Sequence, residues 1–432
     1  MKSKTESSNT FLSYARRTFI GIGALFISLL LVVMFSNLFD SDLTPEAKSI
    51  LNFGSEPGVA PSHNEAYTTL IGLFAEENEN AAVIGDQYLS KLSAVPAWET
   101  KTCSLEKNTS DTNAAKTENC LQPPPRKKAQ HELPPKCRKN RDFCTEAHAE
   151  EVTFLNSTRH IVARMNQLPA YGRLITNKGQ SNLPVSLRSL SIGTFNLHSG
   201  RAIQRAAWSI ELALAAKTDA GLSQKLNEVF ESWKNSNRFL ISSTESEITA
   251  LDAMVLVIAL EANREFMRSA VKTHPRLLGQ VETLLKRDST LIQLNELDAS
   301  KIMRRAHTTE LQILQSTFNE LDQSDAAKRQ FSFGLSEVAL TGEAPSNTAS
   351  LLDRALLEIG FLPNATVNMV AHAMVHSTEI DKNEFGIMSF VHPRNFVGKF
   401  LGAMFASQFQ ALEKNLIQKV EKLKSPIALG DS

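Results

Sequence analysis

Apolar side chains recur every three or four residues through most of the region from Glu150 to Lys424. Residues at this spacing share one face of an α-helix, so each stripe predicts an amphipathic helix. The clearest stripes are Ile203, Ala207, Ile210 and Leu214; Leu222, Leu226, Val229 and Trp233; and Leu251, Val255, Ile258 and Ala262. Hardly any segment alternates with period two, as a half-buried strand would. The pattern therefore predicts an all-α fold.

The breaks between these stripes are short, as at Thr218–Gly221. Short connections favour neighbouring antiparallel helices, either in an irregular helical bundle or in an α-solenoid-like stack. A tetratricopeptide-like signature with a period of about 34 residues is absent from the sequence, which favours the irregular bundle. The last stripe extends from Phe396 to Lys424 and ends in several lysines, which suit the C-terminal end of a helix dipole. We expect it to form an amphipathic closing helix.

The first part of the chain is more varied. Residues 40–62 are rich in Pro and Gly and predict a spacer, with one short helix from Pro45 to Phe53. Residues 63–98 predict a short helical segment of two helices, separated by the polar break Glu76–Glu79. Residues 99–149 are polar, rich in proline and hold all the cysteines, so we expect a non-helical excursion there. Residues 150–424 then form the main helical domain.

An apolar stretch near the N-terminus predicts a membrane anchor. Residues 18–39 carry no charge, and a helix of this length spans a hydrocarbon core of roughly 30 Å. The run is longer than the apolar part of a cleaved signal peptide, and no Ala-x-Ala pattern follows it. Basic residues precede the stretch and acidic residues follow it, namely Lys2, Lys4, Arg16 and Arg17 before it, and Asp40, Asp42 and Glu46 after it. The positive-inside rule therefore places residues 1–17 in the cytoplasm and the rest of the chain outside it.

The four cysteines agree with that orientation. Cys103, Cys120, Cys137 and Cys144 lie close together in the sequence, and none forms a Cys-x-x-Cys pair that would indicate a zinc ribbon or a thioredoxin-like site. An even number of clustered cysteines outside the cytoplasm predicts disulfides. Three connectivities are open, of which we favour the local one, Cys103–Cys120 with Cys137–Cys144.

The cysteine-containing excursion also carries a basic stretch. Its cationic residues are Arg126, Lys127, Lys128, Lys136, Arg138, Lys139 and Arg141. A solvated surface is the simpler interpretation, and a contact with an acidic partner or an anionic lipid surface is the alternative. Aromatic residues are not interleaved with these cations, and Lys+Arg equals Asp+Glu at 46 each, so a nucleic-acid partner is not expected.

Catalytic or metal-binding signatures are weak. His372 and His376 lie one helical turn apart and are the best metal-ligand candidates. A zincin would need Glu directly after the first histidine, and this chain has Ala373. Phosphate-binding loops and a complete nucleophile elbow are also absent from the sequence. We therefore assign no catalytic residue, no metal and no cofactor, and leave open whether the chain is an enzyme, although a non-enzymatic role is favoured.

Three short motifs carry a resemblance. They are Asn64–Gly72, Phe361–Asn368 and Asn395–Lys399. Together with the anchor and the cysteines they resemble an uncharacterised family of proteobacterial single-pass inner-membrane proteins with a helical periplasmic domain. This resemblance implies compartment and architecture but no activity.

The sequence as a whole predicts a bitopic bacterial inner-membrane protein. Its helical periplasmic domain would bind a protein partner or act as an envelope scaffold, because the chain offers extensive helical surface and no catalytic constellation. An envelope hydrolase, with a site assembled from distant helices, is one alternative. A protein that binds lipid or a small ligand between its helices is the other.

Overall fold

The structure, a computed structural model, describes residues 41–53, 64–94, 101–102, 120–121, 132–176, 192–288, 290–323, 362–375, 411–425 and 427. The chain divides into two compact units, a small unit of Met1–Lys48 with Phe318–Ser407 and a large unit of Ser49–Thr317 with Gln408–Ser432. The region 150–424 was expected to form one domain. Its residues Phe318–Ser407 belong instead to the small unit, together with the start of the chain. The units are described separately below.

The fold is all-α, as predicted. Where the structure describes strands, they are only a two-residue parallel pair, β1 (Lys101–Thr102) and β2 (Cys120–Leu121). The α-helices of the large unit are α3 (Glu65–Ile71), α4 (Ala81–Ala94), α5 (Pro135–Lys139), α6 (Ala149–Gln167), α8 (Ile192–Ala215), α9 (Asp219–Ser243), α10 (Ala250–Thr273), α11 (Leu278–Arg287), α12 (Thr290–Asn295), most of α13 (Ala299–Gln323) and a C-terminal helical segment at 411–424. Two 3₁₀ helices, η2 (Leu168–Tyr171) and η3 (Pro275–Leu277), connect them. The expectation that residues 99–149 contain no helix was wrong at α5, because Pro135 stands at the first position of the helix, where its missing N–H is not needed.

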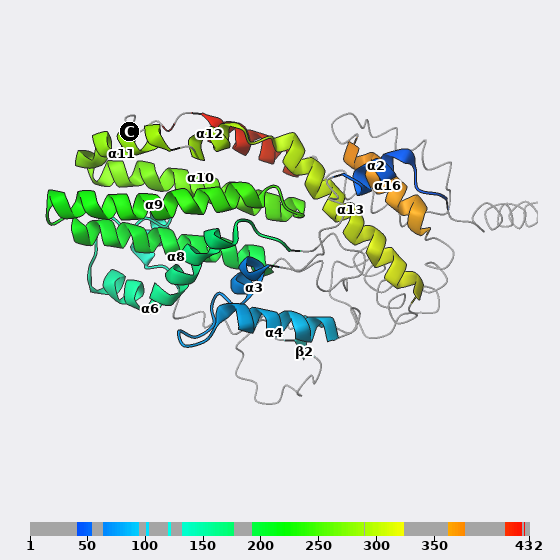
Figure 1. The fold of residues 1–432 in the computed structure, drawn as a ribbon, viewed down its shortest axis with the longest axis horizontal. Coiled ribbons are helices and arrows are strands. Elements are labelled where there is room, and N and C mark those ends of the chain that lie inside the picture. Colours follow the sequence, from blue (N-terminus) through cyan, green and yellow to red (C-terminus); the bar gives the residue numbers. More distant parts are fainter. Residues whose placement is uncertain are drawn as a thin grey trace, which may run out of the picture. The chain divides into compact units, whose positions relative to one another are not determined.

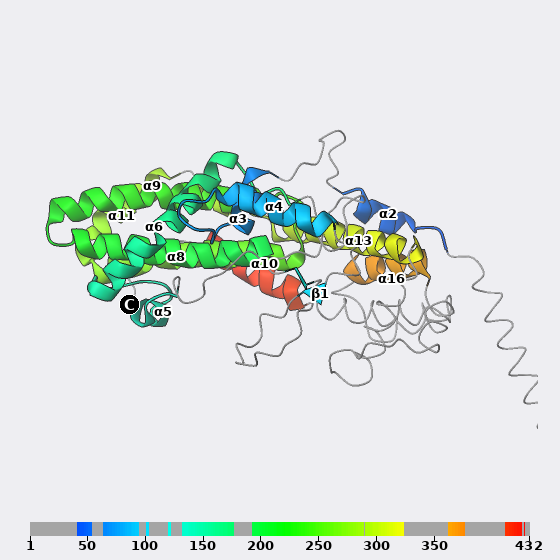
Figure 2. The ribbon, with the colours of Figure 1, turned by 90° about the horizontal axis from the view of Figure 1, so that it is seen from below.

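The long helices α8, α9 and α10, called the central helices here, lie side by side (Figure 1). Helix α6 packs against α8, and α11 packs against α10. The central helices also run along one another in the perpendicular view (Figure 2). A core of aromatic and aliphatic side chains joins the central helices, including Trp208 on α8, Trp233 on α9 and Phe266 on α10. Burial of such large apolar side chains is the main favourable contribution to folding.

The helix boundaries follow local capping chemistry. Thr218 is the N-cap of α9, and its side chain accepts a hydrogen bond from the Gly221 amide. The break predicted at Thr218–Gly221 is confirmed at Thr218, whereas Asp219–Gly221 already form the first turn of α9. Thr249 starts α10 in a capping box with Asp252, in which each side chain accepts from the other residue's backbone N–H. These caps fix where the central helices begin.

The predicted apolar stripes meet different outcomes. All four stripe residues of α9 are buried, which confirms that stripe. On α8 the first three residues of the stripe are buried, as predicted, but the fourth, Leu214, is 36% exposed. On α10 the expected face was wrong at its start, because Leu251 is 42% exposed while Leu256 and Leu260 are buried. The first half of α10 is apolar on nearly every side, so spacing alone could not single out the face that enters the core.

The two short helices predicted within 63–98 are confirmed as α3 and α4. They cross so closely that a Cβ atom added to Gly72 would collide with the Ala81 carbonyl oxygen, and one added to Gly85 would collide with that of Thr68. Glycine at both positions therefore permits the contact between the two backbones.

The small unit contains the start of α2 (Pro45–Leu51) and α16 (Pro363–Val375). The helix expected from Pro45 is therefore confirmed. Asn368 on α16 joins the two segments: its Oδ1 accepts from the Thr44 amide at 2.8 Å, and its Nδ2 donates to the Asp42 carbonyl at 2.9 Å. These bonds explain why residues far apart in the sequence group together.

The predicted anchor at residues 18–39 lies outside the described residues. Within the part of the chain that is described, no helix combines the length and the apolar character needed to cross a membrane.

Candidate functional site

The Cys137–Cys144 disulfide predicted from the sequence is confirmed. Its sulfur atoms are 2.06 Å apart and its Cα atoms 4.4 Å apart. Cys103, of the companion pair predicted with Cys120, lies outside the described residues. We call residues 137–144 the disulfide loop.

The disulfide loop reaches into the core of the large unit. The ring of Phe143 is buried, with its centroid 5.4 Å from that of Phe266 on α10. The Cys144 amide donates to Ser209 Oγ on α8 at 2.8 Å. Arg141 and Asp142 adopt φ values of 55° and 67°, a left-handed conformation that residues other than glycine rarely adopt. The disulfide and these contacts together hold that conformation.

Asp142 is the counter-ion of a buried arginine. Its Oδ2 lies 2.8 Å from Arg205 Nη2, and Arg205 is 2% exposed. One turn earlier on α8, Arg201 is 0% exposed and donates from Nη1 to Gln204 Oε1 at 2.6 Å. Burial, together with the neighbouring Arg205, lowers the pKa of Arg201 to about 9, which still leaves its guanidinium charged at neutral pH.

Sequence reasoning missed this pair of arginines. A signal was present, because Arg201 and Arg205 continue the spacing of Trp208 and Leu212, and all four residues are buried. Only apolar residues were used to define the stripes, so two charged members of the core face were left out.

The part of the basic stretch that is described lies on the surface beside carboxylates. Arg138 Nη2 is 3.4 Å from Glu132, Lys136 Nζ is 3.8 Å from Glu146, and Arg141 Nη1 is 3.6 Å from Glu265. Lys139 is also exposed. The remaining members, Arg126, Lys127 and Lys128, lie outside the described residues. Much of the charge in the described part is thus matched locally.

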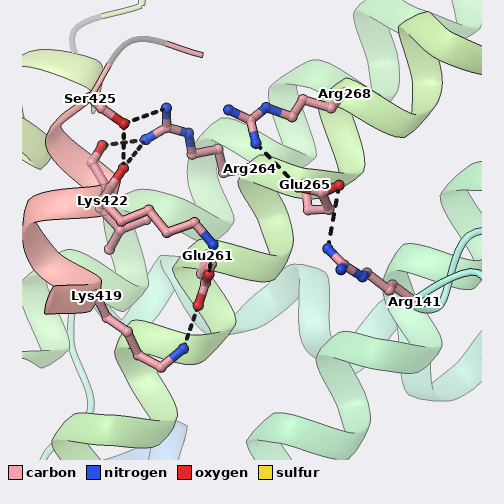
Figure 3. Close-up of polar contacts among 9 residues, drawn as sticks. Arg141, Glu261, Arg264, Glu265, Arg268, Lys419, Lys422 and Ser425 are labelled. Atoms are coloured by element: carbon pink, nitrogen blue, oxygen red, sulfur yellow. Dashed lines mark hydrogen bonds and ion pairs between the residues drawn. The ribbon is translucent and has the colours of Figure 1, made fainter. Parts of the chain in front are cut away.

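The polar face of α10 connects segments from three parts of the chain (Figure 3). Glu265 pairs with Arg268 on its own helix and with Arg141 of the disulfide loop. Glu261 contacts Lys422 and, at 2.6 Å, Lys419, both in the C-terminal helical segment. The row Glu261, Arg264, Glu265 and Arg268 therefore faces the loop on one side and the C-terminal segment on the other.

Arg264 in this row caps the C-terminal segment. Its Nη1 donates to the carbonyl oxygens of Lys422 and Leu423 at 2.6 and 2.7 Å, and its Nη2 donates to Ser425 Oγ at 3.3 Å. The last carbonyls of a helix have no partner within the helix, so a guanidinium placed there satisfies them. Leu416, Val420 and Leu423 on the same segment are buried, which confirms an amphipathic helix at 411–424. Its expected start at Phe396 lies outside the described residues.

An open groove of about 740 Å³ lies between the α3–α4 corner, the start of α5 and one face of α6. We call it the acidic groove, because four glutamates and a single arginine line it: Glu76, Glu77, Glu132, Glu150 and Arg138. Its apolar lining includes Phe74, Leu133, Pro134 and Phe154. His160 also lines it, and burial, with the nearby Arg164, lowers the pKa of this histidine. The lining of the groove therefore combines apolar side chains with negative charge.

Arg164 fixes one wall of this groove. Its guanidinium is buried and donates to four carbonyl oxygens of the α3–α4 corner, at distances from 2.6 to 2.9 Å. Those acceptors are Leu73, Ala75, Glu76 and Glu79. The opposite wall begins at Pro134, directly before the disulfide loop. Both walls are thus held by specific contacts.

A second hollow, of about 540 Å³, lies where the C-terminal end of α9 meets η2, α12 and the start of α13. Three basic and three acidic residues line it, namely Arg238, Lys301, Arg305, Glu245, Glu296 and Asp298. The balanced charges select no particular ligand, and Asp298 already caps α13 through the Ser300 amide.

The histidine candidates gain no support as a metal site. His372 Nδ1 lies 3.4 Å from Glu46 Oε2, while His376 lies outside the described residues. Across the described ranges, no group of three or more His, Cys, Asp or Glu side chains is placed to hold a metal ion.

No known protein family, no curated protein and no solved structure matches the chain. The resemblance to a proteobacterial inner-membrane family therefore stays a prediction.

Proposed function

We propose that this chain is a membrane-anchored scaffold protein of the bacterial envelope, whose helical part outside the cytoplasm holds a cationic segment of a partner protein in the acidic groove. The observation that carries the proposal is the groove itself, whose lining combines apolar side chains with four glutamates and one arginine. Apolar contact supplies binding energy, and complementary charge supplies specificity and association rate.

The charge of the groove favours a protein segment over other ligands. Nucleic acids and anionic lipid headgroups carry negative phosphates, which the glutamates would repel. A segment with lysine or arginine beside a large apolar side chain matches both components of the lining. Because Arg164 and the disulfide loop hold the walls, little ordering entropy is lost when such a segment binds.

The compartment in this proposal rests on two features. The uncharged stretch 18–39 follows basic residues and precedes acidic ones, as expected for a single-pass anchor with a cytoplasmic N-terminus. The Cys137–Cys144 disulfide fits an oxidising environment such as the bacterial periplasm.

Site-specific photocrosslinking in intact cells tests the function. A photoreactive residue at Thr153 or Asn156, both of which line the groove, should give one discrete adduct, whereas the exposed Gln224 on α9 should not. Mass spectrometry of the adduct should identify a crosslinked segment rich in Lys and Arg. Adducts of equal yield at Gln224, or a crosslinked segment that is acidic, would contradict the proposal.

Charge reversal provides the matched control. Glu77→Lys should lower the adduct yield several-fold, because it removes a negative charge from the groove and adds a positive one. Glu282→Lys makes the same change at an exposed position on α11, away from the groove, and should leave the yield unchanged.

A further inference from the structure

The buried arginine Arg201 has donors that nothing in the described structure satisfies. Its Nη1 bonds to Gln204, but Nε and Nη2 have no hydrogen-bond partner among the described residues, although both atoms are fully buried. Nε and Nη2 form one edge of the planar guanidinium, the edge that carboxylates and other anions bind through two parallel N–H bonds. The missing partners thus belong to one side of one group.

Neighbouring groups leave this edge unmatched. The ring of Phe239 lies 5.9 Å from the guanidinium carbon of Arg201, a cation–π contact that brings no negative charge to it. The carboxylate of Asp142 pairs with Arg205, one turn further along α8. The Nε of Arg205 also lacks a partner among the described residues. Among the contacts described for the two buried guanidiniums, one carboxylate, Asp142, stands against two positive charges, which leaves an excess of one positive charge.

An excess charge with unsatisfied donors is costly in a protein interior. Burying a charged group is tolerated when it is paired and hydrogen-bonded, and buried N–H groups almost always find an acceptor. A water molecule would accept hydrogen bonds but would leave the charge unbalanced. We propose that a small monovalent anion, with chloride as the readily tested case, binds the Nε–Nη2 edge of Arg201 between α8 and α9.

The size and charge of this ligand follow from the same contacts. One negative charge balances the two arginines and Asp142, whereas a divalent anion would leave an excess of negative charge. Full burial of Arg201 excludes a bulky ligand. The proposal is independent of the acidic groove, which is formed by other residues.

Anion-dependent thermal unfolding of the full chain in detergent micelles tests the site. At constant ionic strength, replacing methanesulfonate, which is too bulky for an enclosed site, with chloride should raise Tm by about 2–5 °C, and the rise should saturate with chloride concentration. Bromide should act like chloride. A Tm that does not distinguish chloride from methanesulfonate would overturn the proposal.

Two variants locate the effect. Arg201→Met should abolish the chloride-dependent rise, and without chloride it should be at least as stable as the unmodified chain, because an uncompensated buried charge is gone. Arg159→Met, at an exposed position on α6, should keep the full chloride response. A chloride response that persists in Arg201→Met would overturn the assignment.

A third variant covers the case in which Arg201→Met does not fold. Arg201→Lys keeps the charge but lacks the two-donor edge, so we expect about a tenfold higher chloride concentration at the midpoint of the Tm rise, as for the loss of one charge-assisted hydrogen bond. An unchanged midpoint would show that the edge does not bind the anion and would overturn the proposal.

Discussion

Two segments from distant parts of the chain, the disulfide loop at 137–144 and the C-terminal segment at 411–425, pack against the central helices in opposite ways. The loop is closed covalently and contributes a partly exposed carboxylate, Asp142, to an ion pair with the buried Arg205. The C-terminal segment is held by apolar contact, by Arg264 and by the more exposed pairs of Glu261. Breaking an ion pair that has a buried member lowers stability much more than breaking an exposed pair. We therefore expect the contacts of the loop to contribute more to the stability of the fold than those of the C-terminal segment.

The largest expected effect comes from removing the charge of Asp142. Asp142→Asn keeps the shape and suits the left-handed backbone, but leaves Arg205 without a counter-ion, and should lower the free energy of unfolding by about 3 kcal/mol. Urea denaturation of the full chain measures this loss. Asp219→Asn removes the exposed partner of Arg276 and should cost less than about 1 kcal/mol. Equal losses in both variants would show that burial does not strengthen the Asp142 pair.

Removing the disulfide should have the next largest effect. Cys137→Ser with Cys144→Ser should cost about 2–3 kcal/mol for so short a loop. The same changes should release Asp142 from its position, so the loss on adding Asp142→Asn should be well below the sum of the separate losses. Full additivity in this cycle would mean that the disulfide does not position the carboxylate.

A smaller and more local effect is expected from Arg264→Met. The variant leaves the carbonyls of Lys422 and Leu423 without their donor and should cost about 1–2 kcal/mol. Hydrogen exchange should accelerate at 411–425 and stay unchanged in the disulfide loop. Arg268→Met, one turn further along α10, removes a pair with Glu265 on the same helix and is the control. Accelerated exchange in both segments would show that they are not held independently.

The smallest effect is expected at Glu261, where Glu261→Gln should cost less than about 1 kcal/mol. Burial raises the pKa of Glu261, but Lys419 and Lys422 outweigh it, so the net pKa lies below its ordinary value of 4.5. A carboxylate with a lowered folded-state pKa stabilises above its unfolded-state pKa and loses that contribution as the pH falls. Exchange at 411–425 should therefore accelerate as the pH is lowered below about 4.5, after correction for intrinsic exchange. The Glu261→Gln variant should show less of this acceleration than the unmodified chain. An identical pH response in the variant and the unmodified chain would contradict a stabilising role of the Glu261 carboxylate.

The comparison also shows what sequence could predict. The helices α3, α4 and α9, the break at Thr218 and the Cys137–Cys144 pair were predictable, because spacing, capping and proximity in sequence are local properties. The buried face of α10 was not, since apolar residues surround its first half.

The ion pair and the groove depend on tertiary contact. Asp142 and Arg205 are 63 positions apart, and although the spacing on α8 signals the burial of Arg205, nothing in the sequence pairs it with Asp142. The acidic groove combines residues from three segments between 74 and 160, so its charge emerges only when they meet.

The position of Phe143 constrains when the disulfide can form. Cys137 and Cys144 are 0% and 2% exposed, and Phe143 beside them is part of the aromatic core. Thiol–disulfide exchange requires a thiolate to reach a sulfur atom, so an oxidoreductase can act only before this core closes. Oxidation therefore belongs to an early stage of biogenesis, and a reductant should leave the bond intact until the chain unfolds around it.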